Sequence, residues 1–157
     1  MNENQEDQTT RASSEKKESV ESQFERERLE YKDFINEIAN SFRGPIENMA
    51  ETQVKIFSKR QLAVEYTYSL ISKHANAKKR FQIEWKKEYD KLNDSEYRYS
   101  EKEKLKLVES QTANLQYLLS LIQSHIDYIR ETTKTIDNMV FGVKHRIDIE
   151  DFKRGNR

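Results

Sequence analysis

Cations and aromatic rings alternate along residues 78–99, and these two residue types together can bind a nucleic acid. Single-stranded nucleic acid is held by Lys and Arg on its phosphates and by aromatic rings on which its bases stack. Trp85 and Tyr89 also have the helical spacing of core residues. Tyr97 and Tyr99, beside an expected turn, are better candidates for stacking. The candidate DNA-binding residues are Lys78, Lys79, Arg80, Lys86, Lys87, Tyr89, Lys91, Tyr97, Arg98 and Tyr99.

The charge of the chain is unevenly distributed, although the formal net charge is +0. Residues 51–92 hold ten basic and five acidic side chains, whereas residues 1–50 hold seven basic and twelve acidic ones. Residues 93–157 hold eleven of each sign. A basic block of this kind is the electrostatic footprint of an anionic partner, and it also occurs on ordinary solvated helices. Charge alone leaves both interpretations open.

No motif of catalysis or cofactor binding is present in the sequence. There is no glycine-rich phosphate loop and no H-E-x-x-H pair of metal-binding histidines. The three histidines, His74, His125 and His145, lie on separate stretches, and Cys 0 excludes thiolate metal sites and disulfides. The sequence therefore predicts a binding protein rather than an enzyme, with no cofactor and no metal.

The composition indicates long helices as the elements that position these residues. Apolar residues make up 34% of the chain against 36% charged, and the mean hydropathy is -1.05, so a large private core is not expected. The chain has Gly 3 times and Pro only 1 time, which leaves few turns and predicts an all-α fold. We find no apolar run of about 18 residues and no signal peptide, and we expect a soluble, cytoplasmic protein without a membrane span.

Three regions follow from the patterning. Residues 1–23 are too polar to fold and are predicted to be a disordered tail. Residues 24–44 are predicted to form one short amphipathic helix, which ends where Gly44 and Pro45 break it. Residues 45–157 are predicted to be a helical DNA-binding and oligomerisation domain.

Within this domain, a second helix is expected from about residue 46 to residue 92. One face of it carries apolar side chains and another carries cations. The first apolar stripe is Val64, Tyr68, Ile71 and Ala75, and the second is Phe81, Trp85, Tyr89 and Leu92. Asn93, Asp94 and Ser95 are turn formers, and Ser100 with Glu103 matches a capping box that starts the next helix.

A repeat with alternating steps of three and four residues runs from Leu105 to Ile147. Such a 3.5-residue period is typical of coiled-coil-like heptad packing, and the helix would be roughly 60 Å long. We expect that the shorter helices cannot cover all of it, and hence that copies of the chain self-assemble along it. The candidate oligomerisation residues are Leu115, Leu119, Ile122, Ile126, Ile129, Ile136, Val140, Val143, Ile147, Phe141 and Phe152.

These segments together resemble the UvsY family of phage recombination mediators. The likeness covers about residues 60–157: "YSLISKHANAKKR", then "KKEYDKLND" with "YRY", then the long helix closing on "FGVKHRIDIEDFKRG". The matching positions are Tyr68, Ser69, Lys73, His74, Lys78, Lys79, Lys86, Lys87, Tyr89, Phe141, Val143, Lys144, His145, Phe152 and Gly155.

The resemblance implies an all-α, ring-shaped homo-oligomer of six or seven subunits that binds single-stranded DNA. It implies that the protein acts in DNA recombination, repair and replication, in the cytoplasm of an infected bacterial host cell. Its partners would be a RecA-like recombinase, which it helps to load, and the single-strand DNA-binding protein that the recombinase displaces. In the closing stretch, Gly142 would permit close packing, Phe141 and Phe152 would anchor the helix end, and residues 144–146 would face subunits or DNA.

Two other classes remain open. A coiled-coil structural or adaptor protein without nucleic-acid binding would explain the heptads equally well, with the basic block merely solvated. A helix lying on an anionic membrane is less favoured because the apolar stripe already has a packing role.

Overall fold

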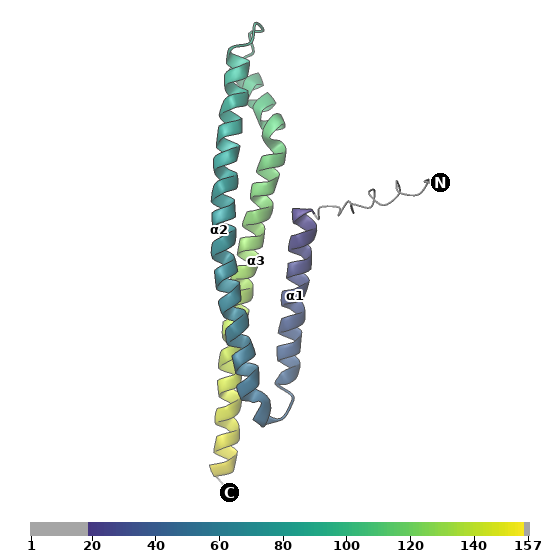
Figure 1. Cartoon of the computed structure of the whole chain (residues 1–157), viewed down its shortest axis with the longest axis vertical. Coiled ribbons are helices and arrows are strands. Elements are labelled where there is room, and N and C mark those ends of the chain that lie inside the picture. The colour runs from purple at the N-terminus through teal and green to yellow at the C-terminus, as the bar shows by residue number, and fades with distance from the viewer. Residues whose placement is uncertain (1–18, 156–157) are drawn as a thin grey trace, which may run out of the picture.

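The computed structural model describes residues 19–155, and all of its regular elements are helical. The helices are α1 (Val20–Ser41), a single 3₁₀ turn η1 (Ile46–Asn48), α2 (Met49–Asn93) and α3 (Glu101–Gly155). Helices α2 and α3 form a long antiparallel hairpin, and α1 lies alongside the half of the hairpin that is far from its turn (Figure 1). The all-α prediction is confirmed for the described residues.

Helix α1 begins earlier than the sequence analysis predicts. The Ser19 side chain caps it by accepting a hydrogen bond from the Ser22 backbone N–H at 3.1 Å. Residues 20–23 are therefore helical, and the predicted tail overlaps the helix there; its remainder, up to residue 18, lies outside the described residues. The helix ends at Ser41, shortly before the Gly44–Pro45 break, as predicted.

Buried side chains recur every seven residues on all three helices. The period of seven keeps one stripe of each helix turned toward its neighbours. On α1 and α2 these positions are Phe24, Tyr31, Ile38, Met49, Ile56, Ala63 and Leu70. On α3 they include Val108, Ile122, Ile129, Ile136 and Val143. Part of the repeat predicted for α3 is therefore buried against helices of the same chain.

The apolar face predicted for the first half of α2 is turned outward. Tyr68 is 70% exposed and Ile71 is 38% exposed, whereas Ala63 and Leu70, which directly precede Val64 and Ile71, are fully buried. Two apolar stripes lie side by side on this helix. The one that includes the small Ala63 faces α1 and α3, and the prediction chose the other.

The closing stretch of α3 packs on the α1–α2 connection. The Phe42 ring packs beside Gly142, 3.4 Å from where a Cβ would lie, which is an ordinary van der Waals distance, so this packing does not require a glycine. Arg146 donates a hydrogen bond to the Gly44 carbonyl at 2.6 Å and thus faces its own chain. Phe141 and Phe152 are 64% and 72% exposed, so they do not anchor the helix end within the chain.

The described helices are too polar to cross a lipid bilayer. No helix within residues 19–155 combines the length and the apolar character needed to cross a membrane. The described helices are instead rich in Lys, Arg, Asp and Glu throughout, in keeping with 36% charged residues in the whole chain.

Candidate nucleic-acid interface

The candidate DNA-binding residues gather at the turn end of the hairpin. We call residues 78–107 the tip; they comprise the end of α2, the connection and the start of α3. The tip holds ten basic and seven acidic side chains, a net charge of +3, whereas α1 holds three basic and six acidic ones. The tip extends beyond the start of α1, so no third helix covers it (Figure 1).

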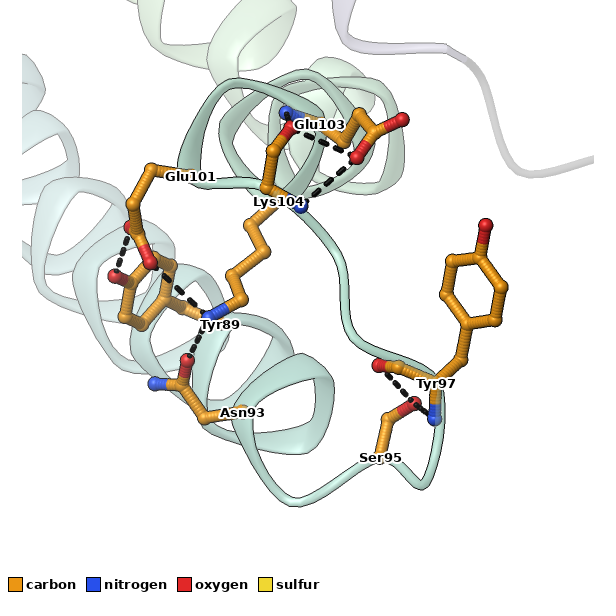
Figure 2. A network of polar contacts seen from close by, with 8 residues as sticks. Tyr89, Asn93, Ser95, Tyr97, Glu101, Glu103 and Lys104 are labelled. Carbon is orange, nitrogen blue, oxygen red and sulfur yellow. Dashed lines mark hydrogen bonds and ion pairs between the residues drawn. The ribbon is translucent and has the colours of Figure 1, made fainter.

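A polar clamp joins the two helices at the tip. The Tyr89 hydroxyl donates to Glu101 Oε2 at 2.8 Å, and Lys104 Nζ donates to Asn93 Oδ1 at 2.7 Å and to Glu101 Oε1 at 3.1 Å (Figure 2). Four side chains of two helices are thereby fixed across the turn. The clamp sets how the connecting residues 94–100 are presented to solvent.

The hydrogen bonds of the clamp also shift the ionisation of its members. The bond to Glu101 raises the pKa of the Tyr89 phenol, and the same bond, followed by that from Lys104, lowers the pKa of the Glu101 carboxyl. Both shifts favour the protonated phenol and the ionised carboxylate at neutral pH.

The predicted capping box starts α3. The Ser100 backbone N–H donates to Glu103 Oε2 at 2.8 Å, and the Glu103 N–H donates to Ser100 Oγ at 3.4 Å (Figure 2). Hydrogen bonds from the Ser100 side chain and backbone lower the pKa of the Glu103 carboxyl. The reciprocal bonds satisfy two backbone donors that a helix start would otherwise leave unpaired, which fixes where the connection ends.

Two tyrosines of the connection remain available. The Ser95 side chain accepts from the Tyr97 N–H at 3.1 Å, and the Tyr97 side chain extends away from the clamp (Figure 2). Tyr97 is 65% exposed, and its ring lies 4.6 Å from that of Tyr99 at an angle of 58°. Beside the rings is an open hollow of about 410 Å³, lined by Tyr97, Tyr99, Glu103, Lys106 and Leu107. A planar base can stack on such a platform.

The cations of the tip fall into two groups. Lys87 and Lys91 form ion pairs with Glu84 and Glu88, respectively, one turn back on the same helix. The remaining exposed cations of α2 in the tip have no ion-pair partner among residues 19–155; they are Lys78, Lys79, Arg80 and Lys86. Arg98 is exposed in the connection. The unpaired group is free to contact phosphates without first breaking a bond.

Tyr89, one of the candidate DNA-binding residues, has a structural position instead. Its ring stacks on that of Trp85 with centroids 5.2 Å apart, and its hydroxyl is held by Glu101. Both rings are half-buried. The core interpretation that the sequence left open for Trp85 and Tyr89 describes their surroundings better than base stacking does.

The candidate oligomerisation residues divide into three groups by burial. Ile122, Ile126, Ile129, Ile136 and Val143 are buried within the chain. Leu115, Leu119, Val140 and Ile147 are half-buried, and Phe141 and Phe152 are exposed. Helices α2 and α1 cover the buried group, and the other two groups are the part of the repeat that these helices do not fully cover.

Helix α2 carries an exposed apolar stripe that was not assigned to assembly. It consists of the exposed Val54, Phe57, Tyr68 and Ile71 with the half-buried Val64, and we call it the outer stripe. Part of it borders an open groove of about 580 Å³, whose other wall is formed by Asp127, Arg130, Glu131, Thr133 and Lys134 of α3. The period of the stripe is visible in the sequence, but only the structure shows that no helix within residues 19–155 lies on it.

Sequence reasoning also missed Asn93, Glu101 and Lys104 as clamp residues. They lie eleven or twelve positions from their partners across the turn, and no periodicity links them. Among residues 19–155, no group of three or more His, Cys, Asp or Glu side chains could hold a metal ion. The candidate binding groups of the tip are its cations and aromatic rings.

The resemblance to recombination mediators rests on short segments, which lie on α2 from residue 68 onward, in the connection and on α3. No family model, no curated protein and no solved structure matches this chain.

Proposed function

We propose that this protein is a non-enzymatic, single-stranded-DNA-binding recombination mediator that grips the strand with the tip. The observation that carries the proposal is that the free cations, the exposed Tyr97 and the half-buried Tyr99 lie on the same end of the hairpin. Lys78, Lys79, Arg80 and Lys86 supply charge along α2, and Tyr97 with Tyr99 supplies a stacking platform beside them. The clamp and the capping box hold that platform in place.

The affinity of one copy for a strand should be modest and dependent on salt. Each phosphate contact made by a cation on a single strand contributes about −0.7 to the slope of log K against log salt. Four unpaired cations therefore give a slope of roughly −3 for one chain. A base stacked on Tyr97 adds about 1–3 kcal/mol of free energy that does not depend on salt.

Self-assembly would raise this affinity, and the outer stripe is the surface that we assign to it. Large apolar side chains in a heptad-like period on a helix favour another helix as the occupant, packed as in a coiled coil. The facing groove wall holds two acidic and two basic residues, so its charge is balanced for a second copy of a chain whose net charge is +0. Several tips on one strand would then act together through avidity.

The mediator role itself follows from the resemblance to the UvsY family. A protein of this kind acts by linked binding equilibria: it holds the strand while a RecA-like recombinase displaces the single-strand DNA-binding protein. It works in the cytoplasm of an infected bacterial host. The ring of six or seven subunits belongs to the same proposal.

A second candidate function is a structural or adaptor protein without nucleic-acid binding. The ion pairs of Lys87 and Lys91 with neighbouring glutamates favour it, because they show part of the basic block engaged in ordinary helix pairing. The outer stripe serves either candidate equally well. Only a binding measurement separates them.

The decisive experiment is fluorescence anisotropy of a labelled single-stranded oligonucleotide over a range of salt concentrations. The variant Lys78→Ala/Lys79→Ala/Arg80→Ala should weaken binding and reduce the magnitude of the salt slope by about 2. The matched control Lys32→Ala/Lys55→Ala/Lys153→Ala removes the same charge from the exposed surface outside the tip and outside the groove, and it should leave the slope unchanged beyond a small, general loss of affinity. No binding by the native chain at low salt would favour the adaptor function.

Assembly is tested separately by sedimentation velocity. Phe57→Glu/Ile71→Glu places two charges on the outer stripe without touching the buried core, and it should shift the chain toward the monomer while its helix content is kept. The control Lys144→Glu/Lys153→Glu adds acidic side chains to exposed positions of α3 and should not dissociate the assembly. A native chain that is monomeric at micromolar concentration would refute the assembly part of the proposal.

A further inference from the structure

A buried polar cluster joins α1 to the hairpin, and neither the tip nor the outer stripe uses it. His125 of α3 is fully buried, and its ring stacks on Phe24 of α1 with centroids 4.0 Å apart. Its Nε2 lies 2.8 Å from Glu27 Oε2, and the same carboxylate oxygen accepts a hydrogen bond from the Tyr66 hydroxyl of α2. One carboxylate of α1 thus serves a polar group on each of the other two helices.

The remaining hold of α1 on the hairpin is thin. Only Phe24, Tyr31 and Ile38 of its 22 residues are buried, and Leu29 is 59% exposed. The bonds of Glu21 with Tyr117 and of Arg28 with Ser124 lie at the exposed surface and contribute little, and one further half-buried bond runs from the Tyr128 hydroxyl to the Arg28 carbonyl at 3.0 Å. The stability of the docked α1 therefore depends strongly on the Glu27 cluster.

We propose that α1 is a releasable strap on the α2–α3 hairpin, latched by Glu27 to Tyr66 and His125, and that protonation of His125 opens the latch. The inference concerns a different part of the molecule from the proposed DNA-binding tip and does not depend on that function. Release would uncover the face of the hairpin that α1 now occupies. Acidification is thus expected to convert a three-helix body into an open two-helix hairpin.

The geometry around His125 favours the neutral ring. Nε2 donates to Glu27, and Nδ1 is buried with no hydrogen-bond partner among the described residues. A proton on Nδ1 would create a buried donor without an acceptor, which costs more than the unpaired lone pair that the neutral ring leaves there. The docked state of α1 therefore disfavours the imidazolium.

The charged and titratable groups that face the ring come from all three helices. They are Glu27 and Arg28 on α1, Tyr66 on α2, and Tyr128 on α3, whose ring lies 6.3 Å from that of His125. Burial is the largest influence and lowers the pKa of His125 below its ordinary 6.5; Arg28 adds to this, and Glu27 opposes it. Hydrogen bonds from Tyr66, Gln23 and His125 lower the pKa of Glu27 in spite of its burial.

Both shifts give the docked state the same dependence on pH. Released α1 leaves His125 in water, where the ring binds a proton more readily, so docking weakens as the pH falls below about 6.5. The carboxylate adds a further loss as the pH falls toward and below its ordinary 4.5. With one proton taken up by His125, the ratio of docked to released chain falls by up to tenfold per pH unit.

The test is a distance measurement between spin labels on α1 and on α3 by pulsed electron resonance. The chain contains no cysteine, so the double variant Leu29→Cys/Ser120→Cys can be labelled at these two exposed positions alone. At pH 7.5 we expect one short distance, and at pH 5 an additional longer and broader population. The control pair Ser69→Cys with Ser120→Cys spans α2 and α3, and its distance should stay unchanged if the hairpin remains folded.

Two variants identify the titrating group. His125→Gln keeps a donor for Glu27 but cannot take up a proton, so it should abolish the change between pH 7.5 and pH 5. Should His125→Gln not fold, Glu27→Ala removes the shared acceptor and should release α1 already at pH 7.5. The proposal is overturned if the native distances are the same at both pH values, if His125→Gln responds as the native chain does, or if α1 stays docked in Glu27→Ala.

Discussion

The two ends of the hairpin use their residues in opposite ways. In the three-helix half, formed by α1 with residues 49–72 of α2 and 117–147 of α3, apolar side chains at seven-residue intervals are buried against one another. In the tip, two helices lie side by side without a third, and polar bonds between Tyr89, Glu101, Lys104 and Asn93 hold them (Figure 2). The first half is held together by burial, and the tip by hydrogen bonds.

This difference teaches where binding can take place without a cost to the fold. Ile129 and Ile136 are fully buried, and no partner can contact them unless the helices separate. At the tip, the free lysines and Tyr97 already lie in solvent, and a ligand there displaces only water. A rigid body combined with an exposed, clamped end is a general arrangement for presenting a binding surface.

The largest expected effect is on stability, and it separates the two regions. Ile129→Ala removes a fully buried side chain and should lower the free energy of unfolding by about 2–5 kcal/mol. Ile83→Ala, at a tip position that is 57% exposed, should change it by no more than about 0.5 kcal/mol. Guanidinium unfolding followed by circular dichroism at one protein concentration measures both. Equal losses would show that the tip has a core of its own.

The next effect is on binding and should be confined to the tip. Tyr97→Ala removes the most exposed ring of the platform and should reduce the affinity for a single-stranded oligonucleotide by about 1–3 kcal/mol without changing the salt slope. Tyr117→Ala, a 55% exposed tyrosine outside the tip, is the matched control and should leave the affinity unchanged. Anisotropy titrations compare the two variants. Equal affinities of the two variants would show that Tyr97 does not contact the strand.

The smallest effect concerns the start of α3. Ser100→Ala deletes the side chain of the capping box and should cost about 1 kcal/mol of stability, since the Glu103 N–H loses its acceptor. Ser110→Ala lies in the middle of the same helix and is exposed, so it should be neutral or slightly stabilising. Thermal unfolding compares them. A neutral Ser100→Ala would mean that water replaces the cap fully.

Much of the fold could be predicted from local signals in the sequence. The scarcity of glycine and proline indicated long helices, Gly44–Pro45 marked the first break, and Ser100 with Glu103 marked the start of α3. Each of these signals acts within a few residues of the position that it predicts. The all-α fold and the helix ends therefore followed with little error.

The sequence was less informative about which faces of the helices pack against each other. The α3 repeat has the period that it was assigned, but periodicity does not say whether the partner helix belongs to the same chain or to another. The same limit explains the choice of Ile71 over Leu70 on α2, because both stripes have a helical period. Contacts such as Glu27 with His125 join residues 98 positions apart, and no pattern in the sequence reports them.

The central claim, that the tip is where a single strand binds, is tested most directly by photo-crosslinking. An oligonucleotide that carries iodouracil is irradiated with the native chain, and the cross-linked peptides are identified by mass spectrometry. Cross-links within residues 78–107, with Tyr97 or Tyr99 as the modified side chain, are the predicted result. Cross-links confined to the three-helix half, or none under conditions in which the oligonucleotide binds, would contradict it.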